Sequence, residues 1–201
     1  MDTRDRIVDA ARRLILTKGL VRATTREIAA AAHVSEGTLY NHFASKEEMF
    51  LAALGQLPAG FIALIVGLRQ RVGSEPVRDV LTEVARVGID FYADAIPMGA
   101  SIFADPELLS RHRALLASRG AGPQRANEAV VAYLQGEQEL GRVRADAYPE
   151  AIAYLLLGAI YQRAYWRQFL GQEGSPAEDD AFIERLMDTL DCALSSETPH
   201  V

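Results

Sequence analysis

The stretch TTREIAAAAHVSEGTLYNHF, residues 24–43, decides the fold of the first part of the chain. Thr24 and Glu27 stand three residues apart, which is the spacing of a capping box at the start of a helix. Small and apolar residues then recur at helical spacing on both sides of a central turn, as in two helices that cross at close range. The pattern predicts short helices at 24–32 and 36–43. That arrangement is a helix-turn-helix, whose second helix fits a DNA major groove about 12 Å wide.

Polar side chains expected on and beside the second helix suit a groove lined by phosphates. Ser35 can cap this helix, and Gly37 lets its backbone approach DNA closely. Groups of the kinds that bind phosphates and base edges come from Thr38, Tyr40, Asn41 and His42. Thr25 before the turn and Lys46 at the start of the next helix are placed to hold the DNA backbone on either side. The segment therefore predicts contact with double-stranded DNA.

Helical periodicity extends over nearly the whole chain, and no segment alternates apolar and polar residues as a strand would. Breaks rich in glycine and proline lie at 73–76, 96–99, 120–123, 141–149 and 171–176. The expected helices are one ending at Lys18, then 24–32, 36–43, one from Lys46 to or through Pro58, 77–95, 105–118, 124–140, 148–170 and 177–195. We therefore expect an all-α fold of about nine helices, with a three-helix DNA-binding head over 1–50 and a helical bundle over 51–201.

The charge of the chain is unevenly distributed. A formal net charge of −6 and a pI near 5.3, taken alone, argue against a nucleic-acid partner. Residues 1–50, however, hold eight basic and seven acidic side chains, whereas the remaining residues hold thirteen basic and twenty acidic ones. The first quarter therefore carries a net charge of +1 and the rest −7, which indicates different partners for the two parts.

Several classes of protein are disfavoured by what the sequence lacks. The densely charged first six residues do not resemble a signal peptide, so we expect a cytoplasmic protein. Cys192 is the only cysteine and is expected to be a small buried side chain, and the four histidines show no metal-ligand spacing. We therefore expect no metal and no cofactor. Because no catalytic triad or phosphate-loop pattern is present, we do not expect an enzyme.

An uncharged run of twenty residues, 49–68, is long enough to cross a bilayer. It contains Gln56, Pro58 and three glycines, and it directly follows a motif that must lie in water. We therefore expect a buried helix that bends or breaks near Pro58, and no membrane partner.

The segment from Ile7 to about Leu54 resembles the TetR (tetracycline-repressor-like) family of bacterial transcriptional regulators. The positions that match the family signature are Thr24, Ile28, Ala29, Ala32, Val34, Ser35, Gly37, Leu39, Tyr40, His42, Phe43, Lys46, Glu47, Met49 and Phe50. The resemblance implies phosphate contacts from Thr25, Ser35, Tyr40, His42 and Lys46. It implies base-facing positions at Glu36, Gly37, Thr38 and Asn41.

Three positions depart from the family pattern. His33 stands where glycine is frequent, at a turn position expected to have a positive φ, which costs a histidine some strain. Glu36 stands where a basic or small residue is frequent, so its carboxylate either accepts a hydrogen bond from cytosine or merely suits the positive start of a helix. Asn41 replaces a common aromatic residue, which favours adenine readout over a phosphate contact.

The resemblance also implies a homodimer whose C-terminal domain binds a small molecule and then releases a palindromic operator. An apolar or aromatic effector is expected from the residues that fall where the family encloses its ligand: Phe61, Phe91, Tyr92, Met98, Phe103, Tyr133, Tyr161, Arg163, Tyr165 and Trp166. The dimer interface is expected at Ile152, Leu155, Leu156, Ala159, Ile160, Phe182, Leu186 and Leu190. Ordinary core packing remains the alternative for each of these side chains.

Two other classes of function stay open at this point. One is an architectural or activating DNA-binding protein without small-molecule release, which a C-terminal domain without a cavity would favour. The other, with least support, is an enzyme housed in the helical bundle.

Overall fold

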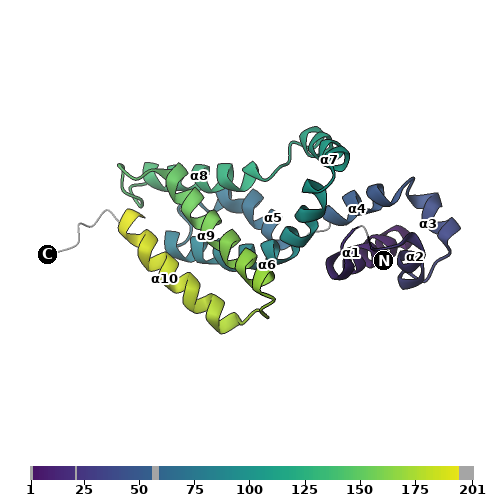
Figure 1. Cartoon of the computed structure of the whole chain (residues 1–201). Coiled ribbons are helices and arrows are strands. Elements are labelled where there is room, and N and C mark those ends of the chain that lie inside the picture. The colour runs from purple at the N-terminus through teal and green to yellow at the C-terminus, as the bar shows by residue number, and fades with distance from the viewer. Residues whose placement is uncertain (1, 21, 56–58, 195–201) are drawn as a thin grey trace. The chain divides into compact units, whose positions relative to one another are not determined.

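The computed structural model describes residues 2–20, 22–55 and 59–194 (Figure 1). Within these ranges the chain forms ten α-helices, one short 3-10 helix and no strand, so the all-α prediction is confirmed with one helix more than expected. The elements are α1 Thr3–Lys18, α2 Thr25–Ala31, α3 Glu36–His42, α4 Lys46–Leu54, α5 Ala59–Gly67, η1 Leu68–Arg71, α6 Val77–Phe103, α7 Pro106–Ser118, α8 Gln124–Glu139, α9 Pro149–Leu170 and α10 Pro176–Leu194.

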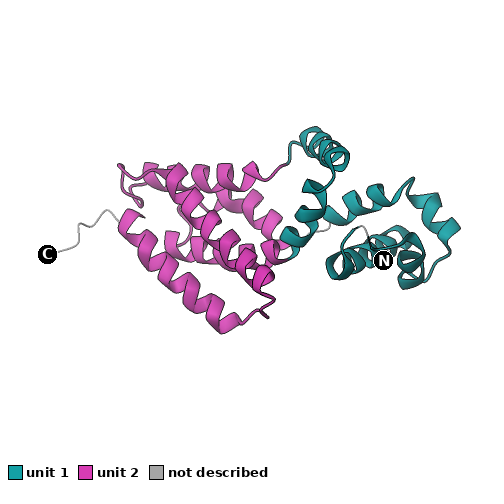
Figure 2. Ribbon diagram, viewed as in Figure 1, with its two compact units in different colours: residues 1–58, 94–121 teal, residues 59–93, 122–201 magenta. Residues whose placement is uncertain are grey.

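The chain forms two compact units, each assembled from separate stretches (Figure 2). Unit 1 comprises residues 1–58 and 94–121, and unit 2 comprises residues 59–93 and 122–201. Helix α6 contributes to both, because its residues from Asp94 onward group with unit 1. The functional division at residue 50 stays a prediction, since the compact units do not follow a single cut of the chain.

Unit 1 is built around α1, which packs against α2 and α4. The carboxylate of Asp2 accepts a hydrogen bond from the amide of Asp5 at 2.7 Å and caps the start of this helix. Ile7 and Ile15 on its apolar stripe are buried, as their spacing predicts. Because α2 and α3 pack on the same core, this stripe supports the helix-turn-helix.

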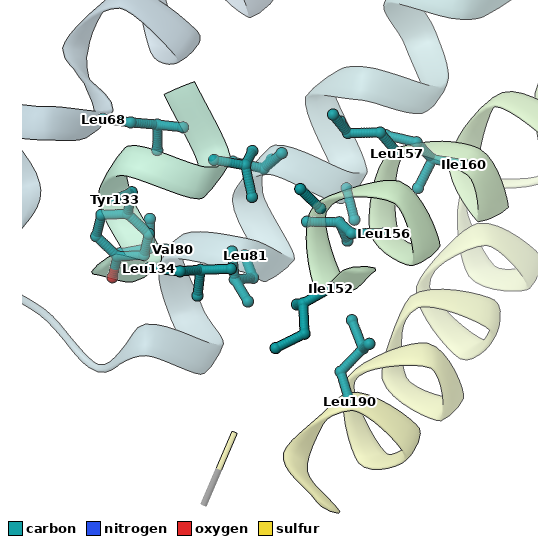
Figure 3. Packing of buried hydrophobic residues seen from close by; sticks show 14 of the residues in the cluster. Leu68, Val80, Leu81, Tyr133, Leu134, Ile152, Leu156, Leu157, Ile160 and Leu190 are labelled. Carbon is teal, nitrogen blue, oxygen red and sulfur yellow. The ribbon is translucent and has the colours of Figure 1, made fainter. Parts of the chain in front are cut away.

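Unit 2 has a second apolar core, formed by α5, η1, the first part of α6, α8, α9 and α10 (Figure 3). Its central side chains include Leu81, Leu134 and Leu156, all fully buried. Gly88 on α6 allows neighbouring side chains to approach closely. A Cβ atom at this position would lie 2.5 Å from Ile160 Cδ1 and 3.1 Å from Phe61 Cε2.

Arginine side chains on α6 and α9 hold the acidic helix α10. The pairs are Arg78 with Asp188 and Asp191, Arg86 with Asp180, and Arg163 and Arg167 with Asp179. Asp179 accepts from Arg163 Nε at 3.0 Å and from Arg167 Nη1 at 2.6 Å, so it ties the start of α10 to α9 from two positions one helical turn apart.

The carboxylate of Glu137 on α8 is fully buried in unit 2. Its Oε1 accepts a hydrogen bond from the amide of Gly73 at 2.9 Å, and its Oε2 lies 3.0 Å from Nε of Arg142. Burial, and then the charge of Glu137, raise the pKa of the neighbouring Tyr133 hydroxyl well above its ordinary value. The buried carboxylate therefore joins the segment before α6 to the partly exposed Arg142 in the loop after α8.

Two helix boundaries and one side chain differ from the sequence prediction. The break expected at 96–99 is absent, because the buried side chains of Met98 and Ile102 keep α6 helical through Pro97 to its end. The helix expected from Lys46 to or through Pro58 ends at Leu54, and Pro58 itself lies outside the described residues. Cys192, expected to be buried, is exposed on α10.

Candidate functional site

A capping box fixes the start of α2, as predicted. The hydroxyl of Thr24 accepts a hydrogen bond from the amide of Glu27 at 3.2 Å, and the Glu27 carboxylate accepts one from the Thr24 amide at 3.1 Å. Lys18 donates to the same carboxylate at 2.7 Å. The hydrogen bond from Lys18, and then those from Thr24, lower the pKa of Glu27 to about 2. The end of α1 and the start of α2 are therefore joined at the base of the motif.

The turn between α2 and α3 has the backbone geometry expected from the sequence. His33 has a φ of 56°, and within the described part of the chain it is the one residue other than glycine with a positive φ. The amide of Val34 donates to the carbonyl of Ala29 at 3.0 Å and closes the turn. Leu39 and Phe43 then bury the inner face of α3 in the core of unit 1. The opposite face of α3 is left to solvent.

That outer face carries the predicted DNA-binding side chains. Ser35 is the N-cap of α3 and accepts from the amide of Thr38 at 3.0 Å. The residues exposed on or beside this helix are Ser35, Glu36, Gly37, Tyr40, Asn41 and His42, while Thr25, Thr38 and Lys46 are half-buried. A Cβ at Gly37 would meet only Ser35 Oγ, at 3.7 Å, so the surface over this turn is open. Their contacts with DNA stay a prediction.

The first residues of α2 and α3 are joined by a side-chain hydrogen bond. Thr25 Oγ1 donates to Glu36 Oε2 at 3.3 Å. The Thr25 hydroxyl, which the family resemblance assigns to a phosphate contact, thus donates its hydrogen bond to a carboxylate of the same chain. Sequence spacing could not show this bond, because the two residues are eleven positions apart and meet only through the packing of the two helices.

The start of α4 is also firmly capped. Ser45 accepts from the amide of Glu48 at 3.1 Å, and the Glu48 carboxylate accepts from the amide of Ala44 at 2.7 Å. Lys46 is the first residue of this helix, as expected. The capping fixes the position from which its ammonium group can reach a phosphate.

None of the six arginines in the head was among the predicted DNA contacts, and the structure draws attention to three of them. Arg22 and Arg26 are exposed near the start of α2, and neither has an ion-pair partner within the described residues. Their place beside Thr25 in the sequence is the signal that could have suggested them. The guanidinium of Arg4 lies 5.0 Å from the centre of the Phe43 ring, a contact between α1 and the residue after α3 that only the folded chain reveals.

Four of the ten predicted ligand-binding residues meet in unit 2. The rings of Phe61 and Phe91 stack with centres 4.7 Å apart, Phe91 and Tyr92 lie 5.3 Å apart, and Tyr92 and Tyr161 lie 5.3 Å apart. Burial raises the pKa of the Tyr92 hydroxyl, with a further contribution from Tyr161. We call Phe61, Phe91, Tyr92 and Tyr161 the aromatic cluster. Their binding of a ligand stays a prediction.

The other six predicted ligand-binding residues do not join this cluster. Arg163 is paired with Asp179, and Tyr133 is buried beside Glu137. Met98 is buried in the core of unit 1, and Phe103 is exposed in the same unit. The last two, Tyr165 and Trp166, are partly exposed on α9 and pack against a further exposed ring, Phe169. Residue type and position in the family pattern selected these ten residues, and neither indicates which of them pack together in the folded chain.

A pocket of about 360 Å³ lies elsewhere in unit 2, lined by Pro76, Val77, Arg78, Gly141, Arg142, Asp191 and Leu194. None of the ten predicted ligand-binding residues lines it. Among the described residues, no group of three or more histidine, cysteine, aspartate or glutamate side chains is arranged to hold a metal. No helix within the same ranges is long and apolar enough to cross a membrane.

The predicted dimer interface needs correction at four of its eight positions. The side chains of Ile152, Leu156, Ile160 and Leu190 are buried in the core of unit 2 and cannot reach a second copy. Ala159, Phe182 and Leu186 are partly buried. Leu155 is exposed and lies on a second apolar face of α9, together with Tyr154, Gly158, Tyr161, Tyr165, Trp166 and Phe169. We call these seven residues the outer face of α9.

Comparisons with known proteins agree with the head and with the fold. Residues 7–53 match the family of bacterial regulatory proteins of the tetR type. The chain is 27% identical over 199 residues to the HTH-type transcriptional repressor AcnR of Corynebacterium diphtheriae, covering 98% of this chain and 93% of that protein.

Among solved structures, a TetR-family transcriptional regulator from Mesorhizobium loti superposes with a TM-score of 0.75 at 19% identity, over 94% of this chain and 95% of the other. Salmonella enterica GusR superposes with a TM-score of 0.69 at 24% identity, over 96% and 95% of the two chains. These structures share the fold, and the relatives are regulators rather than enzymes. The head therefore matches the tetR family of bacterial regulatory proteins, and the chain as a whole shares the fold of solved TetR-family regulators.

Proposed function

We propose that the chain is a homodimeric repressor that holds a palindromic DNA operator and releases it when a small apolar or aromatic molecule binds unit 2. The observation that carries the DNA-binding part is the outer face of α3. Its inner side chains are buried, its turn is fixed by His33, and its polar side chains from Ser35 to His42 point away from the core. A helix presented in this way can enter a major groove.

Within this proposal the two kinds of contact come from different parts of the motif. Tyr40, His42 and Lys46 bind phosphates and set the register of α3 on the duplex. Thr38 and Asn41 face base edges, where the Asn41 amide can pair with adenine. Arg22 and Arg26 add phosphate contacts beside α2, since both are exposed and carry no ion-pair partner within the described residues.

The second part of the proposal is a dimer formed through the outer face of α9. Members of the family bind operators as dimers. Tyr154, Leu155 and Phe169 are 70%, 60% and 68% exposed. Exposed apolar side chains gathered on one helix face are typical of an interaction surface, whereas a monomer usually exposes them singly. Gly158 in the middle of the face permits two helices to approach closely. A dimer carries two heads, as binding to the two half-sites of one operator requires.

The third part is the response to an effector, for which the aromatic cluster is the candidate site. Its lining is apolar apart from the hydroxyl groups of Tyr92 and Tyr161, which suits an aromatic or apolar molecule. The rings are packed on one another, so a ligand must displace them and thereby shift neighbouring α6 and α9. Because coupling is reciprocal, DNA must weaken effector binding by the same factor.

Binding of selected duplexes tests the first part. The chain is incubated with a randomised duplex pool, bound sequences are recovered, and an enriched palindrome serves as operator in titrations at several salt concentrations. Tyr40→Ala should weaken operator binding, and Lys46→Ala should do so and reduce the salt slope by about one per head. Arg185→Ala, which removes an exposed cation from α10, is the matched control. If both head variants bind like the unsubstituted chain, these contacts are wrong.

A DNA-binding regulator without small-molecule release is the second candidate. The ring-on-ring packing of the aromatic cluster favours it, because the four rings already contact one another and a ligand would have to separate them. Titration of planar aromatic compounds against the operator complex separates the two candidates. Release of DNA supports the effector proposal. A compound that occupies the cluster, as measured by quenching of its tyrosine fluorescence, but leaves the operator affinity unchanged supports the second candidate.

A further inference from the structure

The carboxylate of Glu36 occupies an unusual position at the start of the DNA-facing helix. Its Oε2 accepts a hydrogen bond from Thr25 Oγ1 at 3.3 Å. The amide of Thr38, which an acidic residue in the first turn could have capped, is instead capped by Ser35 at 3.0 Å. Glu36 is therefore held toward α2, across the outer surface of the motif, and does not act as a helix cap.

No positive charge neutralises this carboxylate. Within the described residues Glu36 has no ion-pair partner, and its Oε1 accepts no hydrogen bond. Glu27, on the same motif, is by contrast paired with Lys18 at 2.7 Å. An unpaired carboxylate that enters a groove between two rows of phosphates weakens binding, unless the groove offers it a hydrogen-bond donor. Glu36 therefore makes binding conditional on the base that it meets.

We propose that Glu36 reads a cytosine in each operator half-site and that Thr25 positions its carboxylate for this contact. This inference rests on the proposed function, in which α3 enters the major groove. An ionised carboxylate only accepts hydrogen bonds, and in the major groove only cytosine and adenine offer a donor, at N4 and N6. Adenine places the acceptor N7 beside its amino group, which repels the second carboxylate oxygen, whereas the cytosine edge presents the amino group alone.

The same bond changes the role of Thr25. Its single hydroxyl proton is donated to Glu36, so Thr25 acts as a positioning residue rather than as a hydroxyl ligand of a phosphate. Thr25→Val keeps the shape of the side chain and removes the donor. This variant should keep the preference for cytosine but discriminate less strongly, because the carboxylate is no longer oriented. Thr25→Ser restores the donor and should restore the discrimination.

Selection of binding sites from a randomised duplex pool tests the inference with the full chain. The unsubstituted protein should enrich a cytosine at one fixed position of each half-site, and replacing this C·G pair should lower affinity by about 5- to 150-fold per half-site. Glu36→Gln should lose the cytosine and tolerate or prefer adenine there, because an amide can both donate and accept. It should also bind unrelated DNA more tightly. Glu107→Gln, an equal charge change on exposed α7, should enrich the original sequence.

The outcomes separate this inference from the function on which it rests. If the unsubstituted chain and Glu36→Gln enrich the same sequence with the same discrimination, Glu36 does not read a base, although DNA binding stands. If Thr25→Val discriminates as strongly as the unsubstituted chain, the positioning role is wrong. If no variant enriches any sequence, while circular dichroism shows each to be folded, the DNA-binding proposal and the inference both fail.

Discussion

Gly158 provides a sharp test of the proposed dimer, because a larger side chain there should leave the single chain stable but weaken the association of two copies. A Cβ atom at Gly158 would meet no heavy atom of its own chain within 4 Å, and the residue is exposed in the middle of α9. Gly158→Leu should therefore fit the single chain without strain. It should even stabilise the isolated helix by about 0.8 kcal/mol, since glycine is a poor helix former.

The dimer should respond in the opposite direction. Two helices that meet through a glycine can approach to about 8 Å, and a leucine at the contact forces them apart or off their preferred rotamers at a cost of about 1–3 kcal/mol. In a two-fold interface the substitution occurs on both sides, so the free energy of dimerisation should weaken by about 2–6 kcal/mol. At about 1.4 kcal/mol per factor of ten, the dimer dissociation constant should rise about 30-fold or more.

Sedimentation equilibrium over a wide range of concentrations measures this dissociation constant directly. Ala63→Leu, which adds apolar volume to an exposed position on α5 that is not one of the seven residues of the outer face of α9, is the matched control and should leave the constant unchanged. Thermal unfolding of the monomeric variant checks that the chain itself is not destabilised. A Gly158→Leu protein that dimerises as tightly as the control would refute the assignment of the outer face.

Three further predictions concern stability. Arg142→Ala should lower the free energy of unfolding in urea by about 3–5 kcal/mol, because it leaves the buried Glu137 carboxylate without its cation. Adding Glu137→Gln should recover part of this loss. A loss below about 1 kcal/mol would contradict the pairing of Arg142 with the buried carboxylate. Gly88→Ala should lower the free energy of unfolding by about 1–3 kcal/mol, because the added methyl group crowds Ile160 Cδ1. Ile160→Val removes that atom. The double variant should therefore lose less stability than the two single variants lose together. The folded-state pKa of Glu27, about 2, lies below its ordinary 4.5, so its contribution to stability is present above about pH 4.5 and is lost as the pH falls toward 2. In acid titrations followed by circular dichroism, Glu27→Gln should flatten this part of the dependence of stability on pH. An unchanged dependence would argue against the Lys18 pairing.

The sequence predicted the head well because its geometry is encoded locally. The capping pair of Thr24 and Glu27, and the N-caps Ser35 and Ser45, are each set by residues three positions apart. The positive φ of His33 follows from its place in the turn between two such helices. What spacing could not supply is the contact between the helices, such as the bond from Thr25 to Glu36.

The bounds of α9 were predicted to within one residue, but its exposed face was not, because the helix is apolar on two sides. One side carries Ile152, Leu156 and Ile160 and is buried, and the other carries Leu155 and Trp166 and is partly exposed. Helical periodicity identifies both stripes but contains no information about which one faces the chain's own core. Small differences in shape and polarity, such as the hydroxyl and indole groups on the exposed side, decide that choice only when the rest of the bundle is present.

For the proposed dimer, the charges of the head predict that pairing of two heads contributes more to operator affinity than any single side chain does. Three of its cations are already paired: Lys18 with Glu27 and Arg13 with Asp9 inside the head, and Arg12 with Asp94 of α6. With three of its eight basic side chains paired, one head of the proposed dimer has at most five cations left to release counterions from DNA. A second head on the same duplex should therefore multiply the affinity through its high local concentration.

A comparison of two variants follows from this. Lys46→Ala removes one phosphate contact per head, whereas Gly158→Leu touches no DNA-facing residue but separates the heads. At protein concentrations below the dissociation constant of the variant dimer, Gly158→Leu should therefore weaken operator binding more than Lys46→Ala does. On a duplex with a single half-site, the order should reverse, because only the lysine contributes there. If Gly158→Leu also weakens binding to the half-site, its effect does not come from the lost dimer.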